Sequence, residues 1–364
     1  MPDQANAGGK TTTIHPHAKE RSQQKQQTTM ATPIKDVSVE FENATSLLEN
    51  EIFAMEKSLT NFNSLYGIPS IDDVQCCFLS EQSLLDWILA EHPEILKIPS
   101  CCPVCSSKLT LDKKKQSLRC SFCASRKQEY SQSIWKNSYF ENARNGRHKI
   151  MLFLYHWLCG ASTKQLGIYT GWSKGKVNKW LKKAQEMIAE IVRYDHEMIG
   201  GPGIIVEIDE SKFGKRKYNR GHKVDGCWVF GGVELTHERR CFAVVVPDRK
   251  ATTLIPIILS HIHPGSIIRS DCWRAYDIIP FQDGYDYVHE KVNHSQEFVT
   301  EEGVHTNTIE GTWSGIKRTT PVRKRTKKSL PGCLFEFIWR RRNHANLWNG
   351  LMQALKDVYY YNDE

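Results

Sequence analysis

The sequence lacks any apolar run long enough to cross a membrane. A spanning helix needs about 20 predominantly apolar residues, whereas the best candidate, residues 150–159, is short and contains His156. The N-terminus also lacks the apolar core of a secretory signal, so we expect neither secretion nor membrane insertion. The first 40 residues have almost no aromatic side chains and are rich in Gln, Thr, Lys and His. This composition predicts a disordered polar tail over residues 1–40, with Met1 or Met30 as the translation start.

Positive charge is only moderately in excess, because 49 Lys and Arg against 41 Asp and Glu give a formal net charge of +8. The distribution is more informative, because the basic residues are clustered. Clusters of this kind favour a polyanionic partner, most commonly nucleic acid, although Lys-rich solvated surfaces are the alternative. The clusters lie at 113–115, 174–183, 212–220, 317–328 and 340–342.

Twelve cysteines in a chain without a secretion signal indicate thiols or metal ligands, because disulfides are rare in reducing compartments. Cys102 and Cys105 form one Cys-x-x-Cys knuckle, and Cys120 and Cys123 form a second. Two such knuckles predict one structural, four-thiolate Zn²⁺ site in a zinc ribbon over residues 99–135, against the alternative of free core thiols. Cys101 is one residue out of register and is not an expected ligand.

A helical region is predicted over residues 146–196. An apolar helix at 148–160 is followed by a short helix at 163–171, and Ser173 caps a basic helix at 174–192. This order is typical of a helix-turn-helix unit that binds DNA, and an ordinary helical bundle is the alternative. The DNA-binding residues predicted on the third helix are Lys174, Lys176, Asn178, Lys179, Lys182 and Lys183.

The remaining segments differ in their periodicity. Residues 41–98 predict a helical segment, with helices at 44–62 and from a cap at Ser80 to near Pro93. From residue 204 onward, short β-rich runs alternate with helices, which is the order of an α/β domain. Strands are expected at 204–209, 227–235, 241–247, 266–271 and 285–290, and helices at 251–262, 307–318 and 333–356.

Three acidic residues in this α/β region stand out by their order. Asp209 follows an apolar strand, Asp271 ends another strand, and Glu310 begins a helix. Phosphodiester cleavage by two divalent cations needs carboxylates fixed on rigid elements. The three are therefore candidate catalytic residues and ligands for two Mg²⁺ (or Mn²⁺) ions.

These residues also carry a family resemblance. Four segments carry it: EIDESKFGKRKYNRGH (207–222), VFGGVE (229–234), SDCWRAY (270–276) and HTNTIEGTWSGIKR (305–318). Together they resemble the Merlin superfamily of DNA transposases and their bacterial insertion-sequence relatives with an ISXO2-like catalytic domain. The resemblance covers roughly residues 80–350. It implies an RNase H-like domain over residues 202–350, a DDE triad at Asp209, Asp271 and Glu310, and a C-terminal tail at 351–364.

Neighbouring side chains have proposed roles or plainer explanations. Asn307 and His305 are possible helpers of the triad, while Glu207, Glu210 and Asp277 are expected to be solvated or salt-bridged. The tryptophans at 228, 273 and 313 are expected in the core. Basic residues expected to line the DNA path are Lys212, Lys215, Arg216, Lys217, Arg220, Lys317 and Arg318.

Together these features predict a cut-and-paste transposase that binds terminal inverted repeats. Its partners would be the element ends and target DNA, and paired ends predict a dimer or higher oligomer. The basic run at 321–329 is expected either to bind the DNA backbone or to serve as a signal for import into the nucleus. The alternatives are a domesticated, non-catalytic DNA-binding protein, a nuclease of the same fold, and a zinc-dependent interaction protein.

Overall fold

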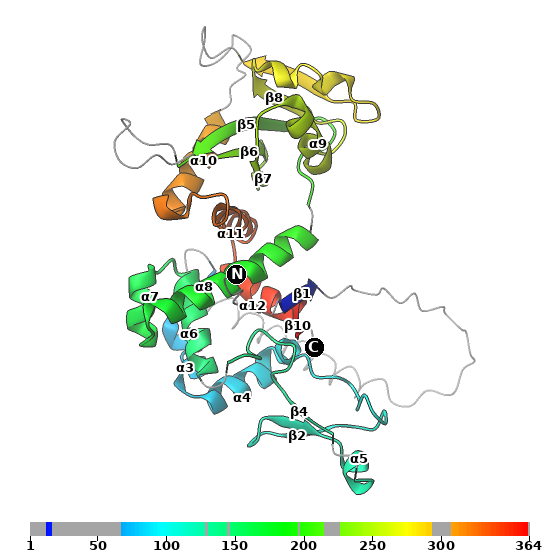
Figure 1. Cartoon of the computed structure of the whole chain (residues 1–364), viewed down its shortest axis with the longest axis vertical. Helices are drawn as coiled ribbons and strands as arrows, with labels where there is room; N and C mark the ends of the chain where they lie inside the picture. The colour runs from blue at the N-terminus through cyan, green and yellow to red at the C-terminus, as the bar shows by residue number, and fades with distance from the viewer. Residues whose placement is uncertain are drawn as a thin grey trace, which may run out of the picture. The chain divides into compact units, whose positions relative to one another are not determined.

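The computed structural model describes residues 12–16, 67–127, 130–143, 146–195, 197–214, 226–292 and 307–362 (Figure 1). The chain divides into two compact units, the first comprising residues 1–178 and 345–364 and the second residues 179–344. None of the helices in the described ranges is long and apolar enough to span a membrane. The helix expected at 44–62 lies outside the described residues.

Short helices open the described part of the first unit. They are α2 (Ile71–Val74), α3 (Cys76–Leu79), α4 (Glu81–Glu91) and the 3-10 helix η1 (Pro93–Leu96). The hydroxyl of Ser80 accepts a hydrogen bond of 3.0 Å from the backbone N–H of Ser83. This is the N-cap expected from the sequence, and it satisfies an N–H group that the first turn leaves without a partner.

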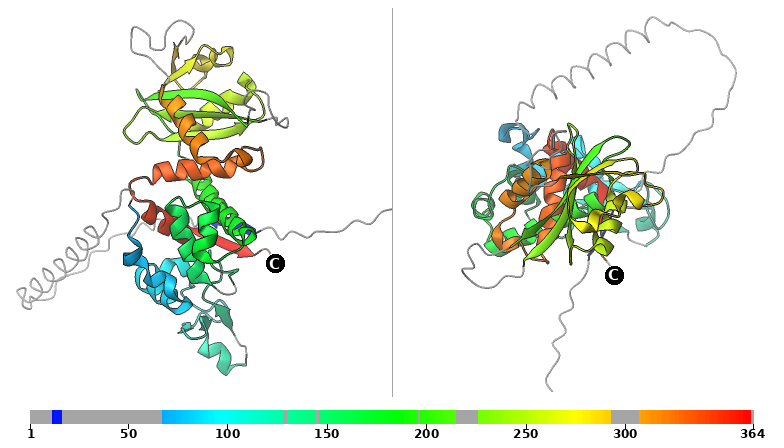
Figure 2. Two further views of the ribbon diagram at one scale, coloured as in Figure 1. Left: turned by 90° about the vertical axis from the view of Figure 1, so that its left-hand side faces the viewer. Right: turned by 90° about the horizontal axis from the view of Figure 1, so that it is seen from above.

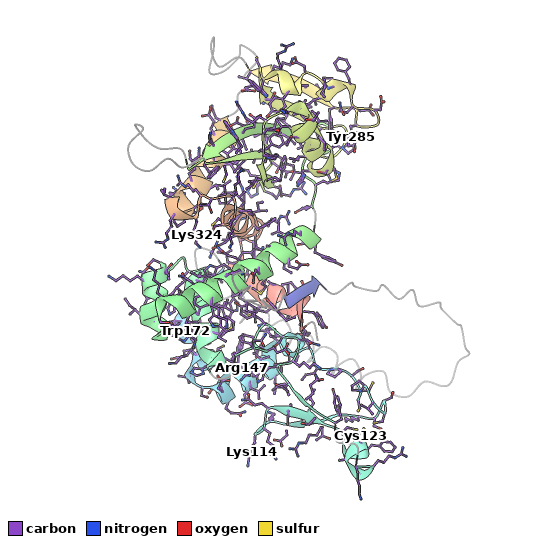
Figure 3. The ribbon with its side chains drawn as sticks, viewed as in Figure 1. Lys114, Cys123, Arg147, Trp172, Tyr285 and Lys324 are labelled. Atoms are coloured by element: carbon purple, nitrogen blue, oxygen red, sulfur yellow. The ribbon has the colours of Figure 1, made fainter. Side chains whose placement is uncertain are left out.

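A small antiparallel sheet follows, made of β2 (Thr110–Asp112), β3 (Ser117–Arg119) and β4 (Ser131–Ser133) in that order. The one-turn helix α5 (Ser121–Ser125) lies between the last two strands. Lys114 marks the tip of the β2–β3 hairpin in Figure 3.

Three consecutive helices come next: α6 (Arg147–Leu158), α7 (Thr163–Thr170) and α8 (Lys174–Tyr194). Helix α8 continues from the first unit into the second, which begins at residue 179. Ser162 and Gln165 form a capping box at the start of α7, and Gly171, at φ 69°, ends it. Ser173 then accepts a 3.4 Å bond from the backbone N–H of Lys176. The bounds agree with the expected helices because these capping residues are local signals.

The ends of the chain differ from their expected structure. Within the tail expected at 1–40, β1 (Thr12–Pro16) pairs antiparallel with β10 (Val358–Asn362). The segment expected as a C-terminal tail therefore contains a strand, and α12 (Leu347–Asp357) precedes it. β-branched and aromatic residues favour extended structure, and the sequences TTI and VYYY supply them.

The second unit is built on a five-stranded sheet of order β7-β6-β5-β8-β9. β5 pairs antiparallel with β6 and parallel with β8, β6 pairs antiparallel with β7, and β8 pairs parallel with β9. The first three strands thus form a meander, and the last two run parallel to its first strand. Their bounds are β5 (Ile205–Phe213), β6 (Cys227–Glu234), β7 (Cys241–Val246), β8 (Ile267–Asp271) and β9 (Val288–Val292).

Alternation along β5 assigns its side chains to opposite faces of the sheet. Val206 and Ile208 belong to a buried cluster with residues of α9 (Ala251–His261). On the other face lies α10 (Asn307–Thr319), which crosses β5 and β6 (Figure 2). Helix α11 (Leu330–Arg342) packs on β7. The single helix expected at 333–356 is wrong, because residues 343–346 separate α11 from α12.

Candidate functional site

The four cysteines of the two knuckles meet in the first unit. Their sulfur atoms all lie within 4.8 Å of one another, with separations of 3.8 Å between Cys102 and Cys123 and 3.4 Å between Cys105 and Cys120. Four ligands about 2.3 Å from a tetrahedral Zn²⁺ would be about 3.8 Å apart. The geometry fits a structural metal such as zinc, with Cys123 projecting from α5 (Figure 3).

The chemistry of the quartet agrees with its geometry. A thiol must be deprotonated to bind a metal. Hydrogen bonding from Ser107 lowers the pKa of the Cys105 thiol to about 6, whereas hydrogen bonding with Cys105 raises the pKa of Cys123. Cys101 is not a member of the quartet. All four positions would be taken by thiolates, so the site has no open position for catalysis.

The three carboxylates of the candidate triad come from three elements of the second unit. Asp209 lies inside β5, Asp271 ends β8, and Glu310 is in the first turn of α10. The expectation that Asp209 follows its strand is wrong, because β5 continues to Phe213 as the partner of β6. Asp209 and Asp271 are half-buried, and Glu310 is exposed.

Asp271 and Glu310 act electrostatically on Asp209. Burial raises the pKa of Asp209 to about 6; the charges of Asp271 and Glu310 act in the same direction, and hydrogen bonds oppose them. Their oxygens are not gathered as tightly as the thiols, since among the described residues only the cysteine quartet falls within 4.8 Å. The repulsion of two like charges beside a partly buried carboxyl would be relieved by cations.

Trp313 connects Asp209 to α10. Its indole nitrogen donates a 2.9 Å hydrogen bond to Oδ2 of Asp209. The ring is buried, as expected, and packs edge-on against Phe213 at 6.2 Å. Gly231, the partner of Asp209 on β6, makes room for it, because a Cβ there would lie 2.7 Å from the Trp313 ring. The close approach of the Trp313 ring therefore explains why the first glycine of VFGGVE, Gly231, has no side chain.

Glu207 fixes the start of the same helix. Its side chain is fully buried, and its Oε2 accepts a 2.8 Å hydrogen bond from the backbone N–H of Ile309. A carboxylate at a helix N-terminus satisfies an N–H group and interacts favourably with the helix dipole. Expecting Glu207 to be solvated was wrong. The sequence signal for the burial of Glu207 was its position two residues before Asp209, which places both side chains on the same face of the strand.

Glu210 occupies the opposite face of β5 and is likewise not solvated. Burial raises its pKa to about 7, and the charges of Asp209 and Asp271 act in the same direction. Hydrogen bonding with the buried hydroxyl of Tyr276 opposes these effects on the pKa of Glu210. By contrast, Asp277 is salt-bridged as expected, 2.7 Å from Lys291.

Basic side chains of the second unit lie close to the acidic site. Lys317 Nζ is 5.4 Å from the centroid of the Phe213 ring. Burial lowers the pKa of Lys317, Arg325 acts in the same direction, and the charge of Asp209 opposes them. Lys212, Arg318 and Asn307 are exposed. His305, Lys215, Arg216, Lys217 and Arg220 lie outside the described residues.

Trp273 is the tryptophan that departs from expectation. It is 41% exposed, whereas Trp313 is 4% exposed. Its backbone N–H donates a 3.0 Å hydrogen bond to Oδ1 of Asp271. The guanidinium carbon of Arg249 lies 4.7 Å from the centroid of the Trp273 ring and 4.2 Å from that of Trp228. An aromatic and cationic surface therefore adjoins Asp271.

The candidate recognition helix α8 exposes its polar residues while Val177 and Trp180 are buried. Lys182 forms an ion pair with Glu186 at 3.3 Å. Lys176 and Lys183 lie 4.5 and 5.1 Å from the rings of Trp172 and Trp180. The residues of the predicted set that are exposed are Lys174, Lys176, Asn178, Lys179 and Lys182, and Lys183 is half-buried.

Comparison with known proteins connects the second unit with transposases. Residues 187–341 match the family model of the ISXO2-like transposase domain. An uncharacterized transposase-like protein of Haemophilus influenzae is 35% identical to the chain over 79 residues, which is 22% of this chain and 61% of that protein. The match thus spans less than two thirds of the relative. These similarities support a DNA transposase family in general.

Proposed function

We propose that this protein is a cut-and-paste DNA transposase of the Merlin type, with an RNase H-like catalytic domain. The observation that carries the proposal is that Asp271 and Glu310 lie near enough to Asp209 for their charges to raise its pKa, within the segment that matches the transposase domain. The sheet order, a three-stranded antiparallel meander followed by two parallel strands, supports this fold assignment.

The proposed triad fits hard divalent cations, because all its donors are carboxylate oxygens and their mutual repulsion is relieved by positive charge. Two Mg²⁺ (or Mn²⁺) ions held by Asp209, Asp271 and Glu310 would activate the attacking oxygen and stabilise the leaving one. Trp313 orients Asp209, and Glu207 holds the helix that carries Glu310. Asn307 and His305 are proposed helpers.

The reaction proceeds in two transfers at phosphorus. Water first attacks the phosphodiester at the element end, the bond to the 3′ oxygen breaks, and a 3′-OH and a 5′-phosphate result. The 3′-OH then attacks a target phosphodiester, whose own 3′ oxygen leaves. Lys317 lies near Asp209, where it can hold a non-bridging phosphate oxygen in both steps.

DNA affinity would come from the basic residues of both units. We infer that α6, α7 and α8 act as a helix-turn-helix, with exposed Lys174, Lys176 and Lys179 against the backbone. Lys212 and Arg318, with the basic segment 215–220, would line the path to the triad. Such contacts weaken steeply as salt rises. Because two element ends would be cut together, we propose a dimer or higher oligomer. We propose that it acts in the nucleus.

The decisive experiment incubates the full chain and Mg²⁺ with labelled DNA that carries the inverted repeats flanking its gene. Wild type should cut the ends and join them to a target plasmid, and Asp271→Asn should do neither. Asp277→Asn, a salt-bridged aspartate six residues away, is the matched control and should keep both activities. Cutting without joining would indicate a nuclease of the same fold. Specific binding without metal-dependent cutting would indicate a domesticated DNA-binding protein.

A further inference from the structure

Trp273 is an exposed tryptophan beside a proposed catalytic residue. Its exposed fraction is 41%, whereas Trp180 and Trp339 of the same unit are 5% and 2% exposed. Burying an indole is normally favourable, because tryptophan has a large apolar surface. The ring is nevertheless left accessible two residues after Asp271.

The indole is also held in place. Its backbone N–H is bonded to Asp271, and its ring nitrogen donates a 3.2 Å hydrogen bond to the backbone oxygen of Arg249. The guanidinium of Arg249 lies within 4.7 Å of the Trp273 ring and 4.2 Å of the Trp228 ring. A ring fixed in this way loses little conformational entropy when a ligand stacks on it.

The positive charges around the Trp273 ring indicate the chemical class of ligand that it would bind. Arg249 contacts both indoles, and Lys212 Nζ lies 5.2 Å from the Trp228 ring. A flat group attached to an anion suits an aromatic ring accompanied by cations, and a nucleotide has this chemistry. Among the described residues, no other ring is packed on Trp273, and 41% of its surface is exposed, so the exposed part of the indole can accept a base.

We propose that Trp273 forms a stacking platform for one unpaired nucleobase next to the phosphodiester that is cut. The proposal rests on the proposed function and adds a nucleobase subsite to it. A base can reach the ring only when it is unpaired, and leaving the duplex costs a few kcal/mol, least where the strand is already frayed or cut. The platform would therefore hold the terminal nucleotide of the element and keep the phosphodiester that is cut next to Asp271.

The test uses 2-aminopurine, a fluorescent base that is quenched when it stacks. It is placed at each position flanking the cut in duplex ends, and separately in a short single strand, with the full chain and Ca²⁺ in place of Mg²⁺. Wild type should quench one duplex position and the single strand, and Trp273→Ala should restore the emission. Loss of one base stack should weaken single-strand binding roughly fivefold or more.

Two further variants control for folding and for general aromatic effects. Trp273→Phe should retain part of the quenching, because a smaller ring still stacks. Phe281→Ala removes a 79% exposed ring of the same unit and should behave as wild type. Thermal unfolding of each variant confirms that it is folded.

The outcomes separate the two proposals. End cleavage by wild type, with emission that is identical in wild type and Trp273→Ala in both DNAs, overturns the platform and leaves the transposase standing. Trp273-dependent quenching in the single strand, without end-specific cleavage, supports the platform and overturns the transposase. Failure to bind either DNA overturns both.

Discussion

The indole nitrogen of Trp313 donates a hydrogen bond of 2.9 Å to Oδ2 of Asp209. Two residues earlier on the same face of β5, Glu207 accepts the backbone N–H of Ile309. Strand β5 is thus hydrogen-bonded to helix α10 at Ile309 and at Trp313, and Glu310 lies between these two residues in the sequence. The relative position of two proposed metal ligands therefore depends on two hydrogen bonds, one buried and one partly buried.

Trp313→Phe should preserve the fold and impair the site. The smaller ring loses the hydrogen bond to Asp209, so the free energy of unfolding should fall by about 1 kcal/mol, apart from the loss of ring volume. Because Asp209 is no longer held, cleavage should require more Mg²⁺ or Mn²⁺ than in wild type. Denaturant unfolding and a metal titration of cleavage measure both effects. An unchanged metal requirement would contradict this role for Trp313.

Glu207→Gln and Glu207→Leu should differ in how α10 is held. The amide oxygen of Gln can still accept the N–H of Ile309, whereas Leu leaves that buried N–H unpaired at about 1–3 kcal/mol. Hydrogen exchange in a peptide covering residues 307–316 should rise strongly in Glu207→Leu and little in Glu207→Gln. Glu234→Leu removes another fully buried carboxylate of the unit and should leave that peptide closer to wild type. Equal exchange in all variants would remove Glu207 as a positioning residue.

Gly231→Ala and Gly311→Ala should change stability in opposite directions. A Cβ at Gly231 would lie 2.7 Å from the Trp313 ring and 2.7 Å from the backbone oxygen of Phe242, so we expect a loss of about 1–3 kcal/mol. Gly311 lies inside α10, and a Cβ added there would have nothing within 4 Å, so alanine should add about 1 kcal/mol. Urea unfolding of the pair checks the steric argument, and destabilisation by both would count against it.

Local signals explain what the sequence predicted well. Ser80 and Ser173 begin helices at the expected positions, and the cysteine spacing specifies its own ligand geometry. The burial of Glu207 was missed because its partner is Ile309, far along the chain. The strand pairing of β1 with β10 was missed for the same reason. The exposure of Trp273 depends on which neighbours cover it, and no periodicity contains that information.

Removal of one cysteine ligand should unfold the ribbon selectively. In Cys120→Ser the quartet loses a thiolate, and structural zinc sites contribute directly to folding. We expect one equivalent of zinc per chain in wild type, a loss of most of it in the variant, and faster proteolysis within residues 99–135. Cys101→Ser is the matched control, because Cys101 lies beside the knuckle but outside the quartet. Equal zinc content in Cys120→Ser and wild type would refute the site.

His289 should make stability depend on pH. Its Nε2 lies 2.8 Å from Ser270 Oγ, which donates its proton to the backbone oxygen of Asp271, so the imidazole is the donor in this pair. Its Nδ1 is buried without a partner among the described residues. Burial lowers the pKa of His289 to about 4, the charge of Lys291 acts in the same direction, and Asp277 opposes them.

The unfolded chain therefore binds a proton at a higher pH than the folded chain, since the ordinary pKa of His is about 6.5. The stabilising contribution of neutral His289 is fully present above about pH 6.5 and is lost as the pH falls through about 4. In His289→Gln, the decrease in thermal stability over this interval should be shallower than in wild type. His263→Gln, which replaces an exposed histidine, should keep the wild-type slope. Parallel curves for wild type and His289→Gln at constant ionic strength would show that this imidazole does not govern the acid sensitivity.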